Sequence, residues 1–173
     1  MKKFGKIFAA ALLTIVAVIA ACMCFVGCSS SDSGSGSGSG SGETREEWSV
    51  YNGTYKFEKA VITSSMNLGG QTYDSTVTVN VGEAYSGVTF TENYMVLTLK
   101  TNGKATFTTE LADAGANSKA EYKWSAEGKK ITLETSGVTA FTFTVNGETI
   151  EYFIDMSTSG TTLTETIYLK KAA

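Results

Sequence analysis

The stretch FTFTVNGETIEYFID, residues 141–155, decides the fold. Aromatic and aliphatic side chains alternate with polar ones on both sides of Asn146-Gly147. Asn-Gly is the strongest short signal for a β-hairpin, because both central residues of its turn need positive φ. A second hairpin of the same kind joins Tyr94–Lys100 to Lys104–Leu111 through Asn102-Gly103. Together the two hairpins predict an antiparallel β fold.

The remainder of the chain after residue 50 continues this pattern. Threonine, valine, isoleucine and aromatic residues dominate, proline is absent, and no long segment has helical periodicity. We expect about nine strands, with one helical turn at Glu43–Trp48 and either a loop or a helical turn at Gly82–Gly87. Besides the two hairpins, the predicted strands are Thr54–Ile62, Thr72–Val81, Ala120–Ser125, Lys129–Thr135 and Thr161–Lys170.

Antiparallel strands joined by short turns form either an up-and-down barrel or a two-sheet sandwich. Sequential hairpins favour the barrel, because each strand pairs with its neighbour in the chain without a long crossover. About eight strands leave an interior that is filled by side chains or holds one small ligand. The residues predicted to point inward are Tyr55, Phe57, Met95, Leu97, Leu99, Phe107, Tyr122, Trp124, Ile131, Leu133, Phe141, Phe143, Ile150, Tyr152, Ile154, Leu163, Ile167 and Leu169.

Residues 1–28 have the composition of an export signal. A basic start is followed by an apolar run from Ile7 to Val26, and a small residue precedes Cys28. The end of this run resembles the lipobox of bacterial lipoprotein signal peptides, in which the cysteine receives lipid and becomes the new N-terminus. We therefore expect lipidation at Cys28 and a domain anchored to the cell membrane on its extracytoplasmic side.

Two other interpretations of this segment remain open. Residues 19–22 also fit a lipobox, which would make Cys22 the lipidated residue. An uncleaved membrane anchor is the third, since about 20 apolar residues span a bilayer. All three leave the basic start in the cytoplasm and place the remaining chain outside.

A flexible linker and one domain follow the signal. Residues 29–42 are almost entirely serine and glycine, which bury no apolar surface and form a flexible tether. Residues 43–173 have the length of one domain.

Composition excludes several functional classes. Cys22, Cys24 and Cys28 all lie in the signal, and the chain has no histidine, so thiolate and imidazole metal sites and the usual catalytic triads are absent from the domain. Without the signal, 11 basic and 17 acidic side chains give a net charge of −6, which disfavours nucleic acid as a partner. We predict no enzyme, cofactor or metal. Hydrolysis by paired carboxylates is the weakest alternative.

Three segments resemble a known family. They are GTYKF at 53–57, LTLKTNGKATF at 97–107 and YKWSAEGKKITL at 122–133, and the ending TIYLKK at 166–171 fits as a final strand. In this order they are similar to the lipocalin-like domains of lipidated bacterial surface proteins. The resemblance implies a β-barrel but no particular ligand. Tyr55 stands where true lipocalins carry tryptophan.

The candidate site is the barrel interior. Aromatic residues there either line a ligand site or form an ordinary core. The candidates for ligand contact are Tyr55, Phe57, Tyr122, Trp124, Phe143 and Tyr152. Glu165 shares strand parity with Leu163 and Ile167, so a regular strand points this carboxyl inward as a polar anchor for a ligand. A position near the barrel rim, or a bulge that changes the phase, is the alternative. We expect non-catalytic binding of a small apolar ligand, or else an interaction module that contacts a protein or glycan through its outer surface.

Overall fold

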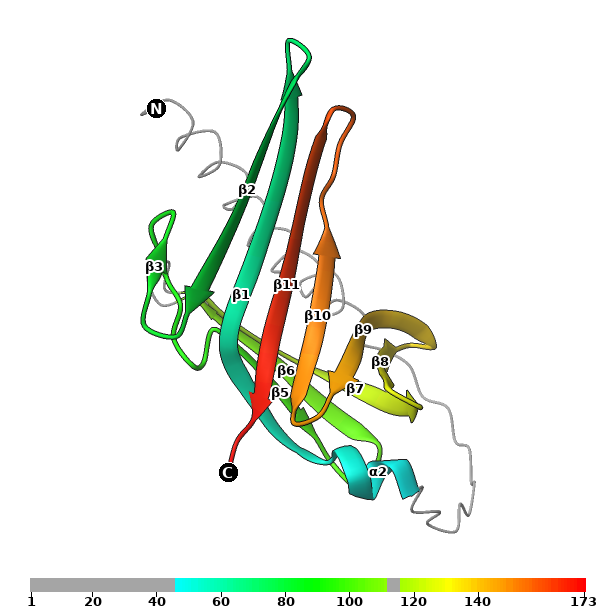
Figure 1. Ribbon diagram of the computed structural model, residues 1–173. Helices are drawn as coiled ribbons and strands as arrows, with labels where there is room; N and C mark the ends of the chain where they lie inside the picture. The colour runs from blue at the N-terminus through cyan, green and yellow to red at the C-terminus, as the bar shows by residue number, and fades with distance from the viewer. Residues whose placement is uncertain (1–45, 112–115) are drawn as a thin grey trace.

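The computed structural model describes residues 46–111 and 116–173. A short helix opens this part of the chain and strands make up nearly all of the rest (Figure 1). The elements are α2 (Glu46–Tyr51), β1 (Gly53–Leu68), β2 (Gln71–Asn80), β3 (Ala84–Tyr85), β4 (Val88–Thr89), β5 (Met95–Leu99), β6 (Lys104–Leu111), β7 (Ala116–Glu127), β8 (Lys130–Thr135), β9 (Val138–Asn146), β10 (Thr149–Asp155) and β11 (Thr161–Lys171).

Eight strands close into an antiparallel barrel. From β5 to β11 each strand pairs with the next one in the chain, and β1 pairs with both β5 and β11, which completes the ring. The prediction of an all-β up-and-down barrel of eight to nine strands is therefore confirmed, and the sandwich alternative is wrong. Because the ring is closed, each of its eight strands has a hydrogen-bonded neighbour on both sides.

The ninth strand, β2, lies outside the ring. The first residues of β1, Gly53–Lys56, pair with β5, whereas Lys59–Leu68 pair with β2. A register shift between Phe57 and Lys59 separates the two parts, as expected of a β-bulge that bends its strand. Because β1 is 16 residues long, its second half carries β2 beyond the ring.

The strands beyond the ring form what we call the distal sheet. It consists of Ala60–Leu68 of β1, Gln71–Val79 of β2, Tyr152–Asp155 of β10 and Thr161–Ile167 of β11, in the order β2-β1-β11-β10. Strand β9 pairs with β10 only as far as Glu151 and then diverges from it. Figure 1 shows these strands continuing away from α2, which lies at the other end of the barrel.

Three local predictions are corrected. Gly82–Gly87 is neither a loop nor a helical turn throughout: it contains β3, which pairs with β4 across a turn with positive φ at Ser86 and Gly87. Strand β7 begins at Ala116 rather than Ala120. The helix predicted at Glu43–Trp48 is present but runs from Glu46 to Tyr51.

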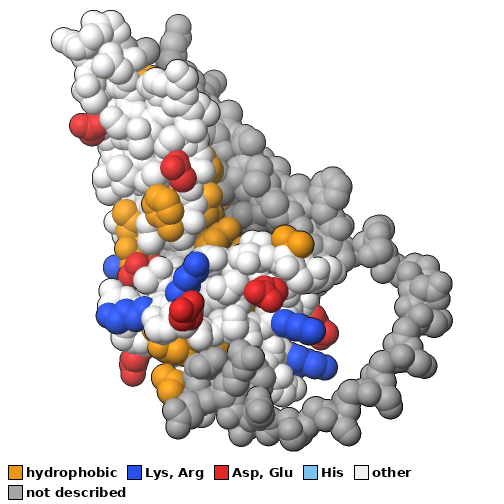
Figure 2. Space-filling view, turned by 90° about the vertical axis from the view of Figure 1, so that its right-hand side faces the viewer, with side chains coloured by type: hydrophobic (Ala, Val, Ile, Leu, Met, Phe, Trp, Pro, Cys, Tyr) orange, Lys and Arg blue, Asp and Glu red, His pale blue; other side chains and the backbone are white. Residues whose placement is uncertain are grey.

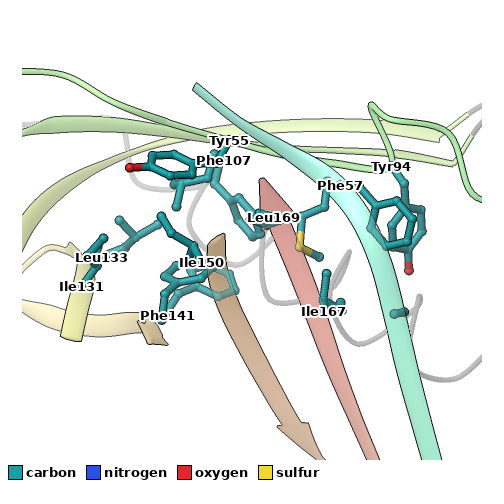
Figure 3. Close-up of a cluster of buried hydrophobic side chains, with 14 of the residues drawn as sticks. Tyr55, Phe57, Tyr94, Phe107, Ile131, Leu133, Phe141, Ile150, Ile167 and Leu169 are labelled. Carbon is teal, nitrogen blue, oxygen red and sulfur yellow. The ribbon is translucent and has the colours of Figure 1, made fainter. Parts of the chain in front are cut away.

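The core follows the predicted inward set closely. All of its members are buried except Tyr152 and Ile154, which are half-buried. Phe90 and Tyr94, outside the predicted set, are buried as well. Figure 3 shows this cluster between the strands, with Tyr94 and Phe57 beside β1 and Phe141 and Ile150 near β10.

The predicted signal (1–28), its lipidation residue Cys28 and the linker (29–42) lie outside the described residues. Within the described part, no helix has the length and apolar character needed to cross a membrane.

Candidate functional site

Hydrogen bonds close the barrel at the α2 end. The Tyr51 hydroxyl at the end of α2 donates to the Gly128 carbonyl at 2.7 Å, and the Tyr55 hydroxyl donates to the Tyr51 carbonyl at 3.0 Å. Trp124 Nε1 donates to the Lys100 carbonyl at 2.9 Å. The predicted site residues Tyr55 and Trp124 therefore have their polar atoms engaged in structure, which is what buried tyrosine and tryptophan require.

Aromatic rings occupy the middle of the barrel. Phe141 is the centre of this group, with ring centroids 4.9 Å from Phe107, 5.6 Å from Tyr122 and 5.8 Å from Tyr152. Phe143 lies 5.3 Å from Tyr152, beside the place where β9 and β10 separate. Three further predicted site residues, Tyr122, Phe143 and Tyr152, thus pack against one another and their neighbours as a core does.

Phe57 belongs to a second aromatic group nearer the distal sheet. Its ring centroid lies 5.5 Å from that of Phe90 and 5.2 Å from that of Tyr94, and Phe90 and Tyr94 are 4.5 Å apart. In Figure 3 the Tyr94 hydroxyl points away from the labelled cluster, on the side where β1 and β11 continue into the distal sheet. The structure therefore separates Phe57 from the other predicted aromatics.

Glu165 lies on the inner side of β11, as the strand pattern predicts. Its side chain is 1% exposed, and it is the buried acid among the described residues. Its neighbours across the two adjacent strands are Ile62 on β1 and Ile154 on β10. The register shift in this region falls in β1, so the alternative of a bulge that turns Glu165 outward is wrong. Glu165 lies in the part of β11 that continues beyond the ring into the distal sheet, which agrees with the other alternative, a position near the barrel rim.

The carboxyl group of Glu165 is electrostatically unusual. Burial raises its pKa from 4.5 to about 7, because desolvation penalises the charged form. Its Oε2 atom is buried without a hydrogen-bond partner in the described structure. Burial, and secondarily the negative charge of Glu165, raise the pKa of Tyr94 above its ordinary value, so Tyr94 stays a neutral phenol.

The face of the distal sheet around Glu165 is mostly apolar. Residues that pair across neighbouring strands share a face, so this side is fixed by the register. It carries Ala60, Ile62, Ser64 and Met66 from β1, Tyr73, Ser75, Val77 and Val79 from β2, Tyr152 and Ile154 from β10, and Thr161, Leu163 and Ile167 from β11. We call these residues and Glu165 the inner face.

A separate cleft of about 510 Å³ lies where β7 extends past the end of β8. Lys104, Lys123, Glu121 and Glu134 line it together with the β8–β9 turn. Figure 2 shows acidic and basic side chains interspersed over the lower part of one side of the molecule. Such mixed charges are typical of a solvated surface.

No group of three or more potential metal-ligating His, Cys, Asp or Glu side chains occurs in residues 46–111 and 116–173. Sequence reasoning did not name Phe90, Tyr94 or the inner-face residues of β1 and β2 as candidate site residues. Phe90 and Tyr94 precede β5, where Tyr94 directly adjoins the alternating run Met95–Leu99.

Comparison of the chain with protein-family models, with curated proteins and with solved structures finds no match in any of the three.

Proposed function

We propose that this chain is a lipid-anchored extracytoplasmic protein whose barrel domain binds a small, largely apolar molecule beside Glu165. The binding is non-catalytic. The site consists of the inner face and the aromatic group Phe57, Phe90 and Tyr94. The strand pattern predicted a site in the barrel interior as a whole. The proposed site is the distal end of that interior, not the aromatic group around Phe141.

The observation that supports this proposal is the unpartnered Oε2 atom of Glu165. A buried polar atom without a partner costs about 1–3 kcal/mol, and a buried charge costs more. Proteins keep such groups where they serve a ligand or a reaction. Since the surrounding strands offer isoleucine, valine and leucine, a ligand with an apolar body and one polar group matches the site.

The anchoring part of the proposal is supported by the sequence. The apolar run ending at Cys28 and the serine–glycine segment 29–42 have the composition of a lipoprotein signal and a tether. The described chain begins with α2, at the end of the barrel opposite the distal sheet (Figure 1). A tether that enters there leaves Glu165 on the side away from its attachment.

Native mass spectrometry of the full chain, extracted mildly from the expressing host, tests the binding. A co-purifying small molecule is expected on the wild-type protein and absent from Leu163→Trp, which fills the inner face beside Glu165. Val138→Trp, a change at an exposed residue, is the matched control and should retain the molecule. A wild-type protein that stays free of any adduct, also after incubation with apolar compounds, contradicts the proposal.

The second candidate function is an interaction module, and β2 favours it. Among the described residues this strand ends the sheet order, and it pairs with β1 alone. An edge strand presents unpaired backbone groups to which another chain can add. Tyr73 on this strand is exposed, and so is Val81, which directly follows the strand. A protein partner would therefore pair along β2.

A further inference from the structure

We infer that the ligand is an amine: a molecule with an apolar body and one ammonium group, which pairs with the carboxylate of Glu165. This inference rests on the proposed function and names the chemical class of its ligand. It follows because Glu165 Oε2 has no hydrogen-bond partner and the neighbouring inner-face residues carry no positive charge.

An ionised carboxylate only accepts hydrogen bonds, so its partner has to be a donor. The inner-face positions on all four strands of the distal sheet contain no lysine or arginine. Among the lysines of β1 and β11, Lys56, Lys59 and Lys170 lie on the other side, where Lys56 lies 3.1 Å from Glu92 and Lys170 lies 3.9 Å from Glu58. Lys171 has the orientation of Ile167 and Leu169 but lies at the α2 end of β11, with its Nζ 5.8 Å from the centroid of the Tyr55 ring. The distal sheet itself therefore offers Glu165 no positive charge.

Among the described residues, the titratable side chains on the Glu165 side of the distal sheet are phenols. Tyr94 precedes β5, Tyr152 lies on β10 two residues from the Ile154 that pairs with Glu165, and Tyr73 lies on β2 near the tip of the sheet. The nearest positions of β1 and β2 are aliphatic or serine, Ile62, Ser64 and Val77 among them. Since a phenol carries no positive charge in either protonation state, these groups leave the carboxylate charge uncompensated.

The same arrangement selects against fatty acids and other anions. Two carboxylates in contact repel each other, and a poorly solvated site strengthens that repulsion. A neutral alcohol can donate one hydrogen bond to Glu165 but brings no charge. Hydrogen bonds to charged groups are stronger than neutral ones, so the expected order of affinity is amine, alcohol, acid.

Equilibrium dialysis of radiolabelled octylamine, octanol and octanoate tests this order on the full chain in lipid nanodiscs, with empty nanodiscs subtracted. At pH 8 we expect octylamine to bind about tenfold more tightly than octanol, and octanoate least tightly. Glu165→Gln keeps the shape of the side chain and removes the charge, so it should bring octylamine to the level of octanol. Glu134→Gln, in the separate cleft, is the matched control and should change nothing.

A second measurement needs no variant. The ionised fraction of a carboxyl with a pKa of about 7 rises about tenfold between pH 6 and pH 8, while an alkylamine stays charged. Octylamine affinity for the wild-type protein should rise accordingly and octanol affinity should not.

The outcomes separate the inference from the proposed function. If octanol or octanoate binds as tightly as octylamine, or Glu165→Gln binds octylamine unchanged, the amine assignment is wrong and apolar binding stands. If none of the three compounds binds, the amine assignment and the proposed binding function are both wrong.

Discussion

Glu165 is an acid among the inward-facing residues of β11, which are otherwise mostly aliphatic. Its neighbours on β11, Leu163 and Ile167, are buried aliphatic residues, and a leucine at position 165 would continue the pattern. A buried carboxyl lowers stability unless something compensates its charge. The acid is therefore better explained by a ligand than by folding.

The first prediction concerns stability against pH. Because burial raises the folded-state pKa of Glu165 from 4.5 to about 7, the folded protein holds this proton more tightly than the unfolded chain does. The stability that this provides is fully present below pH 4.5 and is lost as pH rises towards 7. Between pH 5 and pH 8 the wild-type protein should lose about 2–3 kcal/mol more unfolding free energy than Glu165→Gln. Urea denaturation followed by circular dichroism at both pH values measures this difference. Parallel pH profiles for the two proteins would contradict it.

The second prediction concerns Trp124. Its Nε1 donates to the Lys100 carbonyl at the β5–β6 turn, 2.9 Å away. Trp124→Phe removes this donor and part of the packing, so the unfolding free energy should fall by about 2 kcal/mol. Urea denaturation measures it. Phe153→Leu, at an exposed position on β10, is the control and should change stability by less than about 0.5 kcal/mol. Equal stabilities for Trp124→Phe and wild type would show that the hydrogen bond contributes nothing.

Among the elements, β1 determines the architecture because it takes part in two pairings. Its first residues close the ring with β5, and its second half carries β2. Along most of its length β11 lies on its other side. The bulge between Phe57 and Lys59 marks the change from one partner to the other, so the distal sheet depends on this short segment.

The third prediction follows from the edge position of β2. Hydrogen exchange should be at least about tenfold faster for β2 amides than for amides of β11, which is paired on both sides. Exchange measured by NMR on the full chain provides this comparison, with β6 as a second doubly paired reference. Equal protection of β2 and β11 would indicate that another chain covers the β2 edge, as the interaction-module alternative requires.

Sequence patterns predicted these elements unevenly. The Asn102-Gly103 and Asn146-Gly147 hairpins were predictable, because turn chemistry and strand alternation agree there. The β3–β4 hairpin was missed, since its strands have two residues each and show no alternation. The exclusion of β2 from the ring could not be predicted: Thr72–Val81 has an ordinary strand pattern, and its partner is decided by the length and bend of β1.

Strand alternation also made the candidate site predictable in part. It was enough to place Glu165 on the inner side of β11. Alternation cannot distinguish a residue that lines a site from one that fills a core. The ring contacts of Tyr122, Phe143 and Tyr152 are compatible with both, and Tyr152 also belongs to the inner face. Tyr94 was missed because, as the first residue of the predicted strand Tyr94–Lys100, its alternation with Met95 left it out of the inward set. The structure begins β5 at Met95, and Tyr94 lies in the connection before it.

On the scale of the whole molecule, the two ends of the barrel differ. Helix α2 and its hydrogen bonds lie at one end, and the distal sheet with Glu165 lies towards the other (Figure 1). If the chain is tethered as proposed, the α2 end lies on the side of the attachment and Glu165 lies on the side away from it.

The fourth prediction tests the anchor. If Cys28 is the lipidated residue, Cys28→Ser should abolish incorporation of radiolabelled palmitate and release the chain from the membrane fraction. Cys22→Ser should leave both unchanged, because it alters only the removed signal. Labelling lost in Cys22→Ser instead would assign the lipid to Cys22. A wild-type chain that takes up no label would favour the uncleaved anchor.

The pairing of the first and last strands has a practical consequence. The Ala172 amide donates to the Thr54 carbonyl at 2.8 Å, so the C-terminal end lies against the start of β1. At the far tip of the β1–β2 hairpin, Gly69 and Gly70 are exposed and surrounded by open space. The barrel is therefore suited to circular permutation, with Ala173 joined to Glu46 by a short linker and new termini opened between the two glycines. A tether attached there would invert the domain and turn its closed end outward.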